Sequence, residues 1–147
     1  MAITFIILGS GSSMGVPRAD GYYGNCNLKN KKNHRTRCSA LIKFNKQNFL
    51  IDTSPDLRQQ LLKNKIKNID KVFYTHLHAD QTHGINDLRP FFLIKKKQIP
   101  IFGDLKTSKY LYSTFKYCFK SSQGYPSTLK INILKNCYLF KHQNKKI

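Results

Sequence analysis

The sequence predicts an α/β domain in which strands come first and a helix packs on the outside of their sheet. Short apolar runs at residues 3–8, 39–44, 48–52 and 71–75 have the length and composition of strands. Residues 54–62 carry the signals of a helix start followed by an apolar stripe. At 147 residues the chain has the size of a single domain and enough residues for a hydrophobic core.

The first strand is followed by two segments that favour loops. Residues 9–15 contain three glycines, which allow either a plain turn or the close approach of a ligand to backbone amides. Residues 18–37 are polar and rich in asparagine, and long loops of this kind are often functional. Arg35 and Arg37, at the end of this loop, either contact a substrate phosphate or lie in solvent.

A hairpin and a capped helix come next. Residues 45–47 join two strands as a hairpin. Ser54 is expected at the helix N-cap, with Pro55 in the first helical position. The apolar stripe of this helix consists of Leu57, Leu61 and Leu62.

The later elements are short and less regular. They comprise a helix at 85–89 ended by Pro90, a strand at 99–103, a helix at 107–119 and a strand at 131–134. Periodicity weakens after residue 120, and residues 141–147 form a polar tail. We therefore expect a partial domain over residues 1–120 and a divergent basic tail over residues 121–147.

The composition is strongly basic. Lysine and arginine number 26 against seven aspartates and no glutamate, which gives a net charge of +19. This charge suits a phosphate-containing substrate or RNA, although the lysines are scattered as compositional drift would leave them. The four cysteines are widely spaced and no secretory or membrane-spanning segment is visible, so we expect a cytoplasmic protein with reduced thiols.

The most informative stretch contains three of the five histidines. His76 and His78 follow the apolar run 72–74, and side chains two residues apart in an extended segment point the same way. Asp80 continues that side, or shares the first turn of a helix with His83. Imidazole and carboxylate are ligands of zinc, with iron or manganese as alternatives. The sequence therefore predicts a metal site formed by these four side chains.

Several motifs together resemble the metallo-β-lactamase superfamily. The His-x-His-x-Asp pattern at 76–80 is its signature, and segments 8–17, 37–39 and 50–53 are similar to its phosphodiesterase branch, which includes ribonuclease Z and a phosphoribosyl cyclic phosphate phosphodiesterase. The resemblance covers roughly residues 3–104. It implies the first ββα half of an αββα sandwich and a metal-dependent phosphodiesterase activity with one or two zinc ions.

The resemblance also implies roles for individual residues. His76 and His78 would belong to the first metal site, and Asp80 to the second, where it is the candidate catalytic residue that holds a water or a metal. Asp52 would support the metal-ligand loop without touching the metal, or serve as part of a helix-capping turn. The family has histidine directly after the aspartate, whereas Gln81 stands there in this chain.

The second half of the expected ligand set has no counterpart. No aspartate or glutamate follows Asp104, and the single later histidine is His142. Three hypotheses result: a phosphodiesterase acting on a cyclic phosphate, a nucleotide or an RNA end; an inactive N-terminal remnant of such a hydrolase; or a basic RNA-binding module. We expect weak or no turnover from residues 1–147 alone, while oligomeric state is left open.

Overall fold

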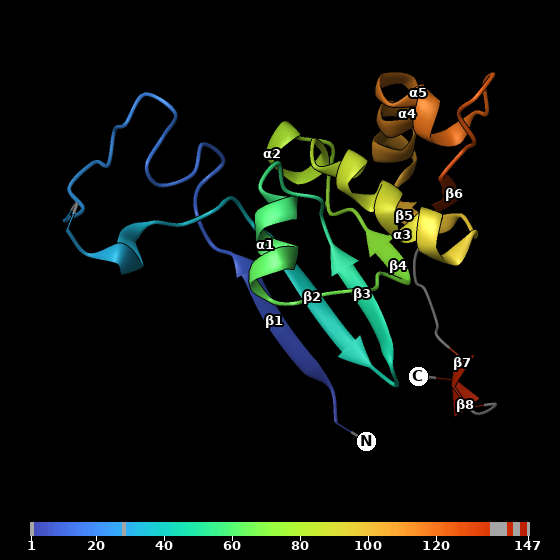
Figure 1. Cartoon of the computed structure of the whole chain (residues 1–147), viewed down its shortest axis with the longest axis horizontal. Coiled ribbons are helices and arrows are strands. Elements are labelled where there is room, and N and C mark those ends of the chain that lie inside the picture. Colours follow the sequence, from blue (N-terminus) through green and yellow to red (C-terminus); the bar gives the residue numbers. More distant parts are fainter. Residues whose placement is uncertain (1, 28, 136–140, 143–144, 147) are drawn as a thin grey trace.

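A computed structural model describes residues 2–27, 29–135, 141–142 and 145–146 (Figure 1). Its main feature is a six-stranded mixed sheet in the order β1-β2-β3-β4-β5-β6. The strands are β1 (Thr4–Gly9), β2 (Ser39–Phe44), β3 (Gln47–Ile51), β4 (Lys71–Phe73), β5 (Ile99–Gly103) and β6 (Leu129–Ile133). β1, β2 and β3 pair antiparallel, and the pairs from β3 to β6 are parallel.

The helices gather on one side of this sheet, while the loop between β1 and β2 projects away from it (Figure 1). They are α1 (Leu57–Lys63), α2 (Ala79–Thr82), η2 (Ile85–Leu88), α3 (Arg89–Lys95), α4 (Leu105–Thr114) and α5 (Lys116–Phe119). The short helix η1 (Lys31–Asn33) belongs to the projecting loop instead. A two-stranded pair, β7 (Lys141–His142) with β8 (Lys145–Lys146), completes the described elements. The α/β class and the common sheet for the first four predicted strands are confirmed.

Three predicted helix boundaries were wrong. Helix α1 begins at Leu57 because Ser54 and Pro55 form a preceding turn, closed by a 2.9 Å hydrogen bond from Leu57 N to Ser54 O. Pro90 lies in the first turn of α3 instead of ending a helix, since that turn requires no donor from the proline nitrogen. The helix expected over 107–119 is divided at Phe115, which leaves helical geometry with φ −116° and ψ 39°.

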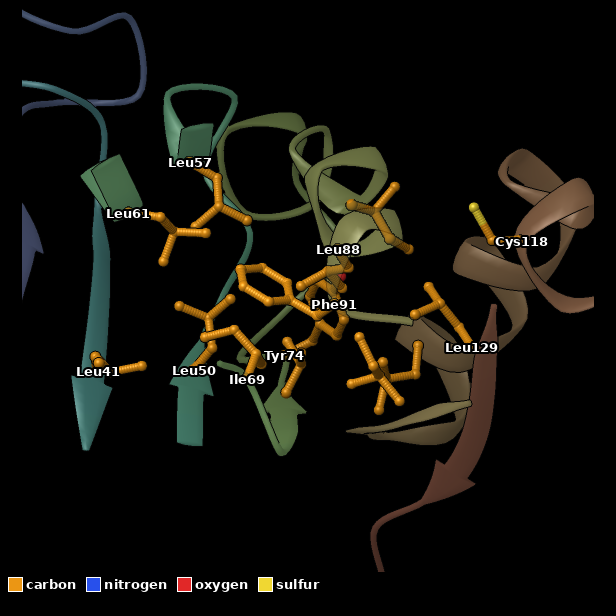
Figure 2. Packing of buried hydrophobic residues seen from close by; sticks show 14 of the residues in the cluster. Leu41, Leu50, Leu57, Leu61, Ile69, Tyr74, Leu88, Phe91, Cys118 and Leu129 are labelled. Carbon is orange, nitrogen blue, oxygen red and sulfur yellow. The ribbon is translucent and has the colours of Figure 1, made fainter. Parts of the chain in front are cut away.

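The core lies between the sheet and the helices. One row of cross-strand neighbours, Ile6, Leu41, Leu50, Val72 and Ile101, runs over five strands on the helix-covered face. Figure 2 shows leucines of α1 packed over Leu41 and Leu50 in this layer. Fully burying such side chains stabilises the fold by about 1.5–3 kcal/mol each, which fixes the strand ends that carry the candidate site.

The opposite face of the sheet is also apolar. Phe5 and Ile7 on edge strand β1 are 61% and 66% exposed. Further along this face, Phe73 stacks on Phe102 with ring centroids 4.9 Å apart. Alternation of apolar side chains on both faces is typical of a sheet that packs on two sides.

The structure describes only part of the expected tail at residues 121–147. Residues 136–140, 143–144 and 147 lie outside the described residues, as do Cys137 and the side chain of His142. β6 falls within the expected tail and pairs with β5, whereas the domain boundary at residue 120 stays a prediction. In the described part of the chain, no helix has the length and apolar character needed to cross a membrane.

Candidate metal centre

The predicted metal loop connects β4 to the short helix α2. Backbone pairing continues one residue beyond β4, because Tyr74 N donates to Phe102 O at 2.7 Å. His78 occupies the N-cap position of α2 in extended geometry, with φ −61° and ψ 155°. The segment from Tyr74 to His78 is therefore non-helical, and it projects His76 and His78 from the end of the sheet.

The two histidines form a close pair. His76 Nε2 lies 3.1 Å from His78 Nδ1, and the rings meet edge to face with centroids 4.6 Å apart. Zinc–nitrogen distances of about 2.0–2.1 Å in tetrahedral geometry place two ligand nitrogens roughly 3.3–3.4 Å apart. Both rings are solvent-exposed. The pair is thus spaced to hold one ion from two sides with little rearrangement.

The other two predicted ligands have different partners. Asp80 Oδ2 accepts a 2.8 Å hydrogen bond from Gln81 Nε2. His83 Nδ1 lies 3.1 Å from Thr82 Oγ1, and its ring meets Phe115 edge to face at 5.5 Å. Over the residues that the structure describes, no group of three histidine, cysteine or acidic side chains is close enough to hold a metal. The structure therefore brings together two of the four.

Asp52 orients the histidine pair through Thr75. The carboxylate accepts one 2.8 Å hydrogen bond from Thr75 N and another of 2.8 Å from the Thr75 hydroxyl. Thr75 Oγ1 also lies 3.0 Å from His76 Nδ1. Because the hydroxyl proton points to Asp52, Thr75 Oγ1 accepts from a proton on His76 Nδ1. Neutral His76 then has its lone pair on Nε2, the atom that faces His78.

Burial and backbone geometry keep Asp52 in this position. Only 5% of the residue is exposed, and burial raises the pKa of its carboxyl, opposed by the two Thr75 hydrogen bonds and the field of His76. Its backbone has φ +60°, a left-handed conformation that is uncommon for a residue other than glycine. Asp52 N donates to Phe73 O at 2.9 Å, so the residue directly continues the β3–β4 pairing.

A second set of contacts ties the metal loop to the start of α1. Thr53 N donates to Gln81 O at 2.7 Å, and its buried hydroxyl lies 3.0 Å from the hydroxyl of Tyr74. Gly84 N donates to Thr53 O at 2.9 Å. A Cβ on Gly84 would lie 1.9 Å from Ser54 O, so the close approach requires glycine.

Gln81 is the notable departure inside the loop. The residue is 7% exposed, and its Oε1 is a buried acceptor that has no partner among the described atoms. Its amide nitrogen is bound to Asp80, as described above. An amide is a poor zinc ligand compared with imidazole. The side chain therefore holds Asp80 in place and adds no strong donor of its own.

Arg37 supplies positive charge near this loop. Its guanidinium forms a two-pronged pair with Asp56, with bonds of 2.9 Å and 2.7 Å. This pairing raises the pKa of Arg37, with a smaller contribution from Asp80. The same contact lowers the pKa of Asp56. Arg37 therefore stays charged, and its field reaches the metal-loop aspartate.

The parts played by Thr75, Thr53 and Gly84 were not predicted from the sequence. For Thr53 and Thr75 the available signal was their position just after strands β3 and β4, because parallel neighbours end at the same edge of a sheet. The histidine pair offers two imidazole ligands of the kind that zinc takes. The two ring nitrogens lie within hydrogen-bond distance of each other, and a buried carboxylate orients one ring through Thr75, as is common around metal-bound histidines.

Residues 47–142 match the family described as "Beta-lactamase superfamily domain". The chain therefore belongs to the metallo-β-lactamase superfamily.

The chain is also similar to individual proteins. Over 124 residues the chain is 34% identical to an octanoyltransferase of Porphyromonas gingivalis, covering 84% of this chain and 25% of that protein. It is 27% identical to ribonuclease Z of Prochlorococcus marinus, covering 97% of this chain and 46% of the relative. A crystal structure of a diphosphatase from the PhnP family superposes with a TM-score of 0.83 at 33% identity.

The chain matches only part of the length of each of these relatives. The superposition on the diphosphatase covers 99% of this chain but 55% of the other, and ribonuclease Z is matched over a similar share of its length. The chain thus spans about half the length of these two relatives and a quarter of the octanoyltransferase. The expected correspondence to part of an αββα sandwich agrees with these proportions.

Proposed function

We propose that this chain provides the metal-binding part of a metal-dependent phosphodiester hydrolase. The observation that carries the proposal is the 3.1 Å spacing of His76 Nε2 and His78 Nδ1, oriented by Asp52 through Thr75. Its support from relatives is the likeness to a PhnP-family diphosphatase and to ribonuclease Z. The substrate class is accordingly a small phosphate ester or an RNA end.

The roles of the side chains follow from their chemistry. His76 and His78 would bind zinc, or manganese or iron, through their facing nitrogens. When bound, such an ion supplies Lewis acidity toward a phosphoryl oxygen and makes water more acidic. Asp80 would orient the attacking water and accept its proton, while Gln81 restrains the Asp80 carboxylate. Asp52 and Thr75 hold His76 in the tautomer that leaves Nε2 free to bind.

We expect the isolated chain to turn over phosphodiesters very weakly. A catalytic zinc site has three protein ligands and a water. The described residues bring only two ligand side chains together, and Gln81 replaces a stronger donor. We therefore expect the chain to bind metal, whether or not it also turns over substrate.

The test measures zinc bound per chain, after loading and removal of free metal. The wild type should retain zinc, and a His76→Ala/His78→Ala variant should lose it. His34→Ala is the matched control, since His34 is exposed and its Nε2 is bonded to Tyr23. Equal zinc in all three proteins would contradict the site. Hydrolysis of bis-p-nitrophenyl phosphate, lost in a His78→Ala control, would instead show that the chain alone is an active enzyme.

A further inference from the structure

We propose that a basic cavity beside strand β1 is an anion site, separate from the histidine pair. It would bind the phosphate group of a nucleotide-sized molecule. The cavity has a volume of about 640 Å³. Its walls come from the end of β1, the segment that precedes β2, and helix α1. None of its lining residues belongs to the metal loop at 74–84. The volume lies within the range of about 300–1,000 Å³ found for small-molecule sites.

The charge of this cavity is entirely positive. Lys31, Lys32, Arg35 and Lys63 line it, and no acidic side chain does. In the described part of the chain, the ion pairs join other residues, as in Arg37–Asp56 and Lys95–Asp70. Four cations around one space repel one another, and an anion between them relieves this repulsion. The cavity therefore favours a ligand with more than one negative charge.

The wall that carries Arg35 is held by several hydrogen bonds. Arg35 N donates to Val16 O at 2.7 Å, and Val16 N donates back to Arg35 O at 3.0 Å. The Arg35 guanidinium donates to Ser10 Oγ at 2.8 Å. Its remaining N–H groups are available to a ligand, because guanidinium has five donors. Arg35 is thus pre-positioned, which lowers the entropic cost of binding.

The opposite wall is joined to this one by Gln60 of α1. Gln60 is 2% exposed, and its amide nitrogen donates to Thr36 Oγ1 at 3.0 Å and to Arg37 O at 2.8 Å. This contact keeps the loop and the helix at a fixed separation. Lys63, one turn further along α1, reaches the same cavity. The positive charges therefore come from the segment that precedes β2 and from helix α1, which the hydrogen bonds of Gln60 hold together.

The lining chemistry suits a phosphate group. Guanidinium and ammonium groups bind phosphate through charge-assisted hydrogen bonds, and Ser10 and Thr36 add hydroxyl groups. Ile7 and Leu8 supply a small apolar surface for the rest of the ligand. A single open pocket of this volume suits a nucleotide-sized ligand better than a polymer, which needs an extended track.

Binding of ADP in the presence of EDTA tests the proposal by isothermal titration calorimetry. A Lys31→Gln/Lys32→Gln/Lys63→Gln variant removes three exposed charges that make no described side-chain hydrogen bond, so thermal unfolding should stay unchanged. Its dissociation constant for ADP should rise roughly tenfold or more. The matched control, Lys106→Gln/Lys109→Gln/Lys116→Gln, removes equal charge from exposed positions on α4 and α5 and should shift the constant by less than about twofold.

The two sites can be told apart in the same experiment. A His76→Ala/His78→Ala variant should bind ADP as the wild type does, whatever the outcome for zinc. Loss of ADP binding in that variant would place the anion at the histidine pair and overturn the proposal. Equally weakened ADP binding in the two lysine triple variants would mean that net charge alone causes the loss, which would overturn the proposal. Binding of a single-stranded RNA oligonucleotide, without binding of ADP, would assign the basic surface to a polymer instead.

Discussion

The Asp52→Asn variant tests whether the buried carboxylate prepares His76 for metal. Asparagine keeps the shape of the side chain and can still accept from Thr75 N. However, its amide nitrogen would face Thr75 Oγ1, where the carboxylate now accepts at 2.8 Å. The hydroxyl proton of Thr75 would then turn toward His76 Nδ1. This favours the tautomer of His76 that carries its proton on Nε2, which cannot bind a metal.

The expected loss follows from this single change of tautomer. Partners that orient metal-bound histidines typically contribute about 10- to 100-fold in metal affinity. In free energy this corresponds to about 1.4–2.7 kcal/mol. Folding should not suffer to the same extent. Burial raises the pKa of Asp52, so its ionised form lowers stability above the unfolded pKa, and a neutral amide removes that penalty.

Zinc competition against a chromophoric chelator measures the affinity, and thermal unfolding in EDTA measures the fold. Asp104→Asn is the matched control, since Asp104 accepts from Thr107 N as the N-cap of α4 and asparagine caps equally well. We expect weakened zinc binding in the first variant only. An affinity for zinc within twofold of the wild type, in a folded Asp52→Asn protein, would refute the tautomer argument.

Three further changes probe the loop and its supports. Gly84→Ala should lower the free energy of unfolding by about 1–3 kcal/mol, because a Cβ would lie 1.9 Å from Ser54 O. Denaturant titration measures this loss, and unchanged stability would contradict the close approach. Asp56→Asn should cost about 1–2 kcal/mol at pH 7 by losing the pair with Arg37. Arg37 lowers the pKa of Asp56 from 3.8, so the stability difference between the wild type and Asp56→Asn should vanish as the pH falls below 3.8. A stability difference that persists in acid would exclude the ion pair as its cause. Gln81→His should raise the zinc bound per chain by adding an imidazole beside the preceding aspartate, as elemental analysis can show; an unchanged zinc content would mean that this position does not limit the site.

Much of the fold could be predicted because its signals are local. The hairpin between β2 and β3 turns at Asn45 and Lys46, both with positive φ, as a tight two-residue connection requires. The strands themselves stand out as short apolar runs. Pro90 was misinterpreted because proline favours both the end of one helix and the first turn of the next. Local sequence does not distinguish these two positions when a short helix precedes it directly.

The basic cavity could not be predicted, because its wall depends on contacts distant in sequence. The segment that precedes β2 bridges back to the glycine-rich loop at Gly11–Arg37 and Val16–Arg35. Gln60 closes the arrangement from α1, 23 positions along the chain from its acceptor Arg37 O. Scattered lysines in a basic chain therefore carried no signal until the fold placed three of them around Arg35.

The histidine pair illustrates how register converts sequence into chemistry. Parallel pairing sets Ile51 opposite Phe73, so Asp52 and Thr75 follow at the same edge of the sheet. A slip of one residue would turn the side chains of β4 to opposite faces and would separate Asp52 from Thr75. The sequence predicts the metal ligands, whereas this register places Asp52 where it can orient His76 through Thr75. Both histidines are exposed at that edge, so the same register leaves the pair accessible from solvent.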